Sequence, residues 1–520
     1  MNFNIFKRKA QQQPPVMHGY CRSFAAAEVS RVLGPWQWDG GFSNQEIASA
    51  LASIRARSRE MHKNNGDFKK FIGMFEANVV GACGFMLKCT AVKSIDDPKL
   101  DAEASFFAEY HFNRWAKNRM WADVTGRKSF AGICRLAAIS WARDGEAFIY
   151  IDRNAQNRYG ISLRIVRPDA CPEWYQGTTS EGNWIRNGIE VQPNSYKPVA
   201  YYFDGAKEDD TNPVIHNGKA HHFVRIPASD IVHLYVQYDE CQTRGIPLTH
   251  AALKKGKMLE CYDEAELVAA RDEANWLGIF HAPAGREGEI ASLDNDTETQ
   301  GKLQRSSRKA HDIILPQGWD YDPKVPQHPN REVTAFKATM KRDLANALGV
   351  EYANFANDWA GVNFSSVRAG TLAERDMWMV LQEGFIEKCC TPIYLAWLDS
   401  WLRLSLSGKY TVRDFERMAE HIFRARRWAW VDPMKDINAA VIAVSHHWKT
   451  DAQVAAEYGT DYDDNLEEAA RVKALREQYG LAEPLTDTPA PSAAGADDDD
   501  GKNEDDDKGG ENAETDDDKK

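Results

Sequence analysis

The chain has 520 residues, a length that predicts about three domains with enough apolar side chains to bury a core in each. Its nine cysteines include no C-x-x-C pair, which argues against a zinc ribbon and against a secreted disulfide framework. The N-terminal segment lacks the apolar core of a signal peptide, and the apolar run at 79–87 is too short to span a bilayer. We therefore expect a multidomain globular protein in a reducing compartment, with no membrane helix.

Acidic residues concentrate at the C-terminus. Residues 497–520 contain 13 acids and 4 lysines, so this segment supplies −9 of the net charge of −13. Residues 484–520 are predicted to be a disordered acidic tail, because too few large apolar side chains are present to offset the entropy of ordering. Two interpretations stay open: a solubilising tail, or an acidic element that repels or mimics DNA.

The first half of the chain has a mixed pattern. Helical periodicity at 43–62, 67–80 and 101–118 precedes "SFAGICRLAAISWARDGEAFIYIDR", where a helical pattern changes to a strand pattern at Asp-Gly-Glu. Short strand-like runs follow at "ISLRIV", "VAYYF" and "DIVHLYV", separated by turn residues. This order predicts an α+β domain, a sheet with flanking helices.

The second half is mainly helical. A long helix is predicted over 247–278 and a second over 333–348, with Gly349 placed to end it, and the two bracket a small polar module like the legs of a hairpin. The loop "NDWAGVNFSSVRAG" has neither helical nor strand periodicity. After it, a helix starting near Val367 should be kinked or interrupted by Pro392.

Chemical motifs of enzymes are absent from the sequence. There is no G-x-x-x-x-G-K-[ST] phosphate loop, no G-x-S-x-G and no H-E-x-x-H, and the two His-His pairs have no metal-binding companions at the usual spacing. We expect no catalytic residue, no cofactor and no metal site.

Five phrases occur in an order that resembles the lambda-type portal proteins of tailed bacteriophages. They are "RGIPLTHAALKKGKMLECYDEAELVAARDEA", "ILPQGW", "FKATMKRDLANALGVEYANFANDWAGVNFSSVRAGTLAERD", "DPMKDINAA" and "GTDYDDNLEEAA", which together span residues 244–470. A weaker likeness extends back to about residue 24.

The resemblance implies a ring, in this family usually of twelve subunits, at one vertex of the capsid. Double-stranded DNA would pass through the ring without sequence preference during packaging and ejection. The implied partners are the terminase large subunit, the major capsid and scaffold proteins, and the head-completion or adaptor proteins, with no membrane. The ring would also nucleate procapsid assembly in the host cytoplasm before it becomes part of the virion.

The resemblance also divides the chain into regions. They are an N-terminal arm (1–23), an α+β wing (24–246), a stem helix (247–278), a small α/β clip (279–332), a second stem helix (333–348), a channel loop (349–366), a kinked helix that returns to the wing (367–430), a helical crown (431–483) and the tail (484–520).

In portal proteins the segment after the second stem helix projects into the channel. The candidate residues for contact with DNA are Asn354, Asn357, Trp359, Asn363, Phe364, Ser365 and Arg368. Amides, hydroxyls and aromatic rings suit a conduit, because each cation bound to phosphate would add a salt-dependent grip. Two alternatives stay open: the loop is an ordinary connection with buried aromatic rings, and Arg368 pairs with a carboxylate within the fold.

The clip contains a basic cluster, Lys302, Arg305, Arg308 and Lys309. In portal proteins this region faces the packaging motor and later the head-completion proteins, so the cluster could meet an acidic partner or entering DNA. The alternative is a solvated basic face.

The sequence favours a portal over two other function classes. A DNA-processing enzyme, such as the packaging motor, is disfavoured by the missing phosphate loop and the missing metal-binding carboxylates. A virion protein ejected with the DNA is disfavoured because the sequence has no repeats and no amphipathic membrane segment.

Overall fold

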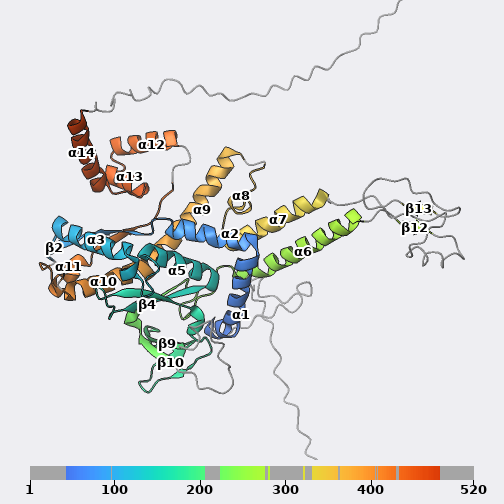
Figure 1. Ribbon diagram of the computed structural model, residues 1–520, viewed down its shortest axis with the longest axis horizontal. Helices are drawn as coiled ribbons and strands as arrows, with labels where there is room; N and C mark the ends of the chain where they lie inside the picture. Colours follow the sequence, from blue (N-terminus) through green and yellow to red (C-terminus); the bar gives the residue numbers. More distant parts are fainter. Residues whose placement is uncertain are drawn as a thin grey trace, which may run out of the picture. The chain divides into compact units, whose positions relative to one another are not determined.

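The computed structural model describes residues 43–94, 96–204, 223–275, 279–281, 320–322, 331–360, 363–404, 406, 408–428 and 433–480. The chain divides into two compact units, Met1–Arg426 and Arg427–Lys520. In the first unit, helices pack beside small antiparallel sheets, and the described part of the second unit is helical (Figure 1). The α+β, mainly helical class expected from the sequence is confirmed.

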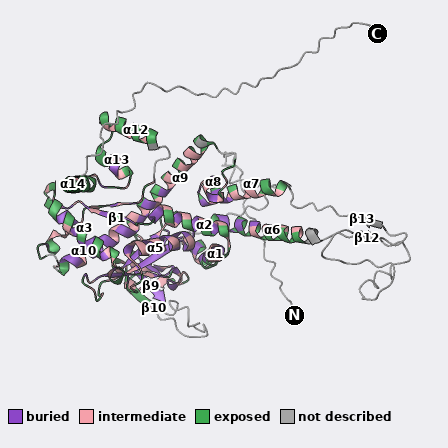
Figure 2. Ribbon diagram, turned by 45° about the horizontal axis from the view of Figure 1, so that its top comes forward, coloured by how far each residue is buried: buried purple, intermediate pink, exposed green. Residues whose placement is uncertain are grey.

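Three helices of the first unit pack together. They are α1 (Ser43–Asn64), α2 (Gly66–Phe75) and α5 (Phe130–Asp144), and each packs against the other two. Asn65 separates α1 from α2 and caps α2, because its side-chain oxygen accepts bonds from the backbone N–H groups two and three residues further on. Phe75, at the end of α2, is fully buried. Of the three helices, α5 packs directly against β4, and it is largely buried in Figure 2.

Two antiparallel sheets lie beside these helices. The three-stranded sheet has the order β11-β4-β5, and the five-stranded sheet has the order β10-β9-β8-β7-β6. Their strands are β4 (Glu146–Asp152), β5 (Ser162–Val166), β6 (Gly177–Thr178), β7 (Trp184–Arg186), β8 (Ile189–Val191), β9 (Pro198–Asp204), β10 (Phe223–Pro227) and β11 (Ile231–Tyr235). Side chains from both sheets form one hydrophobic core around Phe148 and Tyr201. The predicted strands are present, but the sequence pattern did not reveal that they divide between two sheets.

A buried ion cluster joins this core to α1. The carboxylate of Glu146 accepts hydrogen bonds from Arg55 (2.9 Å), from Arg244 (2.5 and 3.0 Å) and from the backbone N–H of Gly245 (3.1 Å), and it lies 3.0 Å from His233 Nε2. Glu146, Arg244 and Arg55 are all buried. Burial alone would raise the pKa of Glu146, but the charges of Arg244 and Arg55 and the hydrogen bond with His233 lower it below its usual range. The carboxylate is therefore ionised in the folded protein.

The backbones of Gly145 and Gly245 lie against each other beside this cluster. Gly145 ends α5 in the left-handed region (φ 90°), and a Cβ there would lie 2.4 Å from the carbonyl carbon of Ile246. A Cβ on Gly245 would lie 2.1 Å from the carbonyl oxygen of Gly145. Because both obstacles are backbone atoms, neither position has room for a side chain.

A pair of long helices extends from the first unit (Figure 1). α6 (His250–Asn275) and α7 (Arg331–Leu348) run antiparallel, with Tyr262 and Phe336 in ring contact at 5.0 Å. Lys337 pairs with Asp263 (3.0 Å) and Lys255 with Asp343 (3.1 Å) along the same seam. Between the helices, β12 (Ile279–His281) pairs with β13 (Asp320–Asp322). The hairpin expected from the sequence is present, although α6 begins at His250 rather than at 247 and α7 begins two residues early.

An interrupted helix follows the candidate loop. α9 (Phe364–Phe385) continues through a π-helical turn (Ile386–Cys390) into α10 (Thr391–Arg403). The π turn ends at Cys390, two residues before Pro392, which has no N–H to donate and whose ring would clash with a regular preceding turn. The predicted interruption is therefore confirmed, and α9 begins three residues before the predicted start. A second π turn (Glu76–Val80) extends α2.

The chain then returns to the first unit. β14 (His421–Arg424) pairs antiparallel with β1 (Met86–Cys89), and Phe423 packs against Phe112 and Tyr394. The other short elements of this unit are β2 (Val92–Ser94), β3 (Asp97–Leu100), α3 (Ala102–Lys117), α4 (Arg119–Ala122), α8 (Tyr352–Ala356), α11 (Phe415–Met418) and the 3₁₀ turns Pro168–Ala170, Ala228–Asp230 and Val412–Asp414.

The second unit contains α12 (Pro433–Ser445), α13 (Asp451–Glu457) and α14 (Tyr462–Tyr479). Thr450 caps α13 in a capping box with Gln453, and the side chain of Asp461 caps α14. The helical segment predicted from the sequence is present here.

In the described residues, no helix is both long and apolar enough to cross a membrane. The cysteines described by the structure carry free thiols.

Candidate functional site

The candidate loop begins where α7 ends. Gly349 takes the left-handed conformation (φ 70°), its N–H donates to the carbonyl of Asn346 (3.2 Å), and the N–H of Val350 donates to the carbonyl of Ala345 (3.0 Å). These two bonds form a Schellman motif, which uses carbonyl groups that the helix end leaves unpaired. The glycine signal in the sequence therefore marks the start of the loop correctly.

The loop is not wholly irregular. Residues 349–366 were expected to lack regular structure, but α8 forms within them and α9 starts before their end. Asn357 ends α8 in the left-handed region (φ 53°), a conformation that asparagine tolerates better than most residues. The hydroxyl of Tyr352 donates to Asp358 (2.7 Å), and Arg342 lies over the Tyr352 ring at 4.6 Å.

Lys70 of α2 holds α8 from one side. Its Nζ donates to the backbone carbonyl of Asn354 (2.5 Å) and to the side-chain oxygen of Asn357. Burial lowers the pKa of Lys70; Asp67 opposes this shift and Lys341 adds to it. Lys341 in turn donates to Asp67 (3.0 Å), which ties α7 to α2 beside the same contact.

Glu374 of α9 holds α8 from the other side. It is buried, and its two carboxylate oxygens accept bonds from the side chain of Asn354 (2.5 Å) and from the indole N–H of Trp378 (3.1 Å). The Asn354 amide is thus engaged within the fold. Lys70 and Glu374 together fix the path of the loop relative to α2 and α9.

The other candidate residues differ in their surroundings. The indole of Trp359 is 51% exposed, and Ser365 is exposed. Asn363 caps α9, since its side-chain oxygen accepts the N–H of Ser366 (2.8 Å). Arg368 is half-buried.

Some predicted site residues lie outside the described residues. They are the side chain of Phe364 and the basic cluster Lys302, Arg305, Arg308 and Lys309. Sequence reasoning missed Lys70 and Glu374, and no local motif marks either residue.

Comparison with known proteins decides the family. A model of the lambda family of phage portal proteins matches residues 30–382. The chain belongs to this family. Portal proteins are structural components at the connection between head and tail, so this portal chain is not an enzyme.

Two phage portal proteins agree with this assignment. A probable portal protein of Halomonas phage phiHAP-1 is 30% identical over 85% of this chain and 84% of its own length. Portal protein B of Escherichia phage lambda is 19% identical over 82% of this chain and 85% of its own length. Among solved structures, a chain from the neck of an empty gene transfer agent particle is 12% identical, with a TM-score of 0.43, over 79% of this chain and 93% of that one.

Within the described residues, no group of histidine, cysteine, aspartate and glutamate side chains could hold a metal ion.

Proposed function

We propose that this portal protein assembles into a closed ring of about twelve subunits around an axial channel. The ring sits at one capsid vertex of the virion, where double-stranded DNA enters during packaging and leaves during ejection. It is assembled in the host cytoplasm, where it nucleates the procapsid together with the major capsid and scaffold proteins.

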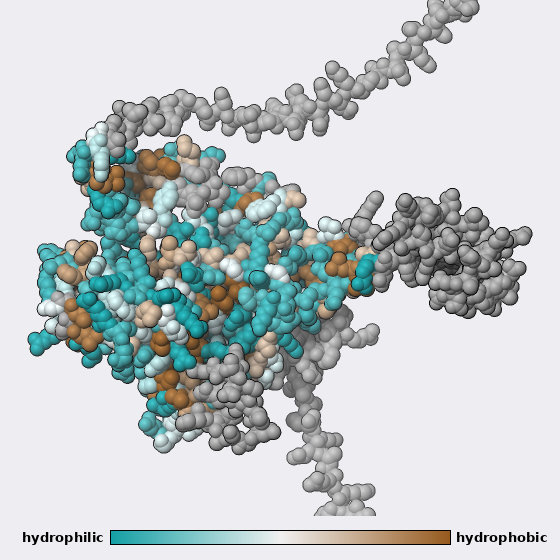
Figure 3. All heavy atoms as spheres, viewed as in Figure 1, coloured by the Kyte–Doolittle hydropathy of each residue, from teal (hydrophilic) through white to brown (hydrophobic). Residues whose placement is uncertain are grey.

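The observation that carries the ring is the exposed apolar surface of α6 and α7. Met258, Leu267 and Phe336 are 64%, 71% and 44% exposed although they lie on long helices that are otherwise rich in charge. Figure 3 shows hydrophobic side chains at the surface of this helix pair. Neighbouring copies of the pair, packed side by side around an axis, would cover these side chains and gain the free energy of removing them from water.

The second unit has a similar apolar face. Met434, Ile437, Val441 and Ile442 follow one another at helical spacing along α12, and all are exposed. We assign this face to the same ring contacts, in the crown. The wing, stem, clip and crown divisions of the chain belong to this proposal.

The loop between α7 and α9 lines the channel. Trp359, Asn357 and Ser365 present an aromatic ring, an amide and a hydroxyl, and the neighbouring Asn354, Asn363, Phe364 and Arg368 complete the lining segment. A lining poor in cations lets DNA slide. Few phosphate groups are neutralised by the protein, so few counterions are released from the DNA and the binding free energy stays small. Lys70 and Glu374 keep the loop in place under the load of the moving duplex.

The clip is the docking site for the terminase large subunit during packaging and for head-completion or adaptor proteins afterwards. Its basic cluster, Lys302 to Lys309, supplies charge for an acidic partner surface or for entering DNA.

Native mass spectrometry with negative-stain imaging of the full-length chain tests the ring. We expect a closed particle with an axial hole and a mass about twelve times the subunit mass of 58.7 kDa. Leu267→Asp should give free subunits with an unchanged circular dichroism spectrum, because the side chain is exposed in the subunit but covered in the ring.

Leu267→Met is the matched control, and it should assemble like the wild type because it keeps apolar volume at the same place. Rings formed equally well by Leu267→Asp would contradict the assignment of this face.

A further inference from the structure

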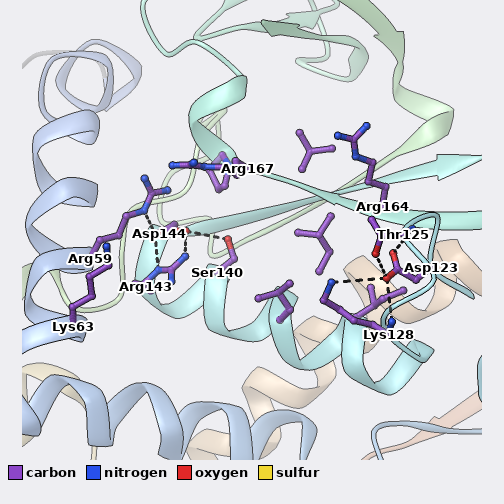
Figure 4. A pocket seen from close by; sticks show the side chains of 15 residues that line it. Arg59, Lys63, Asp123, Thr125, Lys128, Ser140, Arg143, Asp144, Arg164 and Arg167 are labelled. Carbon is purple, nitrogen blue, oxygen red and sulfur yellow. Dashed lines mark hydrogen bonds and ion pairs between the residues drawn. The ribbon is translucent and has the colours of Figure 1, made fainter. Parts of the chain in front are cut away.

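A polar cavity of about 510 Å³ lies in the first unit, away from α6, α7 and the candidate loop. Its walls come from α1, α5, β5 and the loop before α5 (Figure 4). Cationic side chains dominate the lining: Arg59, Lys63, Lys128, Arg143, Arg164 and Arg167.

The carboxylates near the cavity are already used by the fold. Asp144 accepts bonds from Arg59 (2.8 Å) and from Arg143 (2.8 and 3.0 Å). Asp123 accepts bonds from the hydroxyl and N–H of Thr125 and from two further backbone N–H groups, and it lies 3.8 Å from Lys128.

The third carboxylate, Asp169, lies just outside the lining and pairs with Arg59, Arg55 and Arg167. Desolvation opposes ionisation of Asp169 and of the other two carboxylates, but the hydrogen bonds and nearby charges lower all three pKa values. The lining itself carries six cationic side chains and two carboxylates, Asp123 and Asp144, so its formal charge is positive even when the nearby Asp169 is added.

We propose that this cavity binds an acidic peptide segment, with its Asp and Glu carboxylates inserted between the arginine side chains. Guanidinium groups match carboxylates in a two-bond geometry, and ion pairs with the buried Asp144 hold Arg59 and Arg143 in place before any ligand arrives. A hollow of this size admits a few residues of flexible peptide. Duplex DNA carries its phosphates on the outside of a stiff rod and reaches only the rim.

We assign the site to an acidic segment of a partner protein, and the chain's own acidic segment supplies a probe of the same chemistry. Residues 497–518 have the required chemistry, with runs of aspartate separated by glycine and other small or polar residues. A synthetic peptide of this segment can therefore test both whether the cavity binds acidic peptides and whether the chain's own segment competes for it.

The test is fluorescence anisotropy of a labelled synthetic peptide, residues 497–518, added to the full-length chain. We expect saturable binding that weakens as salt rises, and no binding of a control peptide with Asn and Gln in place of its acids. Lys63→Gln combined with Arg164→Gln should raise the Kd roughly tenfold, since two exposed charges are removed from the rim. The circular dichroism spectrum and the melting temperature of this double variant must match those of the wild type, which checks that the cavity walls stay intact.

Arg57→Gln combined with Lys197→Gln is the matched control, because both residues are exposed and neither lines the cavity. Equal weakening by the two pairs of changes, or no binding even at low salt, overturns the proposal. Duplex DNA that binds with the same dependence on Lys63 and Arg164 would replace the peptide as the ligand and also overturn it.

A full-length chain with its 13 tail acids changed to Asn and Gln identifies the source. Tighter peptide binding by this chain shows that the protein's own segment competes for the cavity. Unchanged binding leaves a partner protein as the source, and both results require that the cavity binds the peptide.

Discussion

Replacing Glu146 by glutamine should strongly destabilise the first unit. The change keeps the size of the side chain but removes the negative charge that faces Arg55 and Arg244, both of which are buried. Removing one partner of a buried ion pair costs about 3–5 kcal/mol, because the remaining charge stays away from water without compensation. Here two guanidinium groups lose the same partner, although Arg55 keeps a second carboxylate at 3.2 Å. We therefore expect a loss of about 4 kcal/mol in the free energy of unfolding.

Urea unfolding of the subunit, followed by tryptophan fluorescence and by circular dichroism, measures this loss. With a slope of about 3 kcal/mol per molar urea or more for a unit of this size, the midpoint should fall by about 1 M. Glu190→Gln is the control, because Glu190 is equally buried but its partner, Arg225, is 45% exposed and can return to water. That change should cost no more than about 1–2 kcal/mol. Equal losses for the two variants, or a loss below about 1 kcal/mol for Glu146→Gln, would refute the reasoning about uncompensated charge.

Three further results are expected. Burial lowers the pKa of His233 despite its contact with a carboxylate, so the unfolded chain binds a proton more readily than the folded chain. The free energy of unfolding should therefore fall as pH drops below about 6.5. His233→Gln should make the dependence of the urea midpoint on pH shallower. Gly145→Ala should leave the chain largely insoluble, whereas Gly66→Ala, where a Cβ meets nothing within 4 Å, should keep or slightly raise the melting temperature. Lys70→Met should leave the melting temperature within a few degrees of the wild type but speed hydrogen exchange in residues 349–360 by about tenfold or more; unchanged exchange there would show that α8 does not depend on this lysine.

Local signals in the sequence predicted several features of the fold correctly. Gly349 ends α7 because the Schellman motif requires a residue with positive φ, which glycine adopts without strain. Pro392 interrupts its helix because it has no N–H to donate. Both effects depend on the residue itself, so neither requires knowledge of the rest of the chain. The five phrases were sufficient for the family, since their order is specific.

The contacts that position the candidate loop could not be predicted in this way. Lys70 reaches Asn354 across 284 positions, and its sequence neighbourhood resembles that of any amphipathic helix. Residue type alone places Asn354 and Asn363 in the same candidate set as Trp359. In the fold, Asn354 bonds the buried carboxylate of Glu374 and Asn363 caps α9. The amide composition of a loop does not show which amides are already engaged. The cationic cavity was missed for the same reason, because its residues come from segments that only the fold brings together.

The pairing of β1 with β14 places a constraint on synthesis. A strand near residue 86 has its partner at residue 424, more than 300 positions later. At 5–20 residues per second, a ribosome needs roughly 15–70 s to produce that partner. Throughout this interval β1 has an open edge, and Phe112 lacks its contact with Phe423. The open edges of β1 in nascent chains on one messenger RNA can therefore pair with each other instead of with β14. Slower translation, or a chaperone that covers β1, should change the yield of soluble subunits.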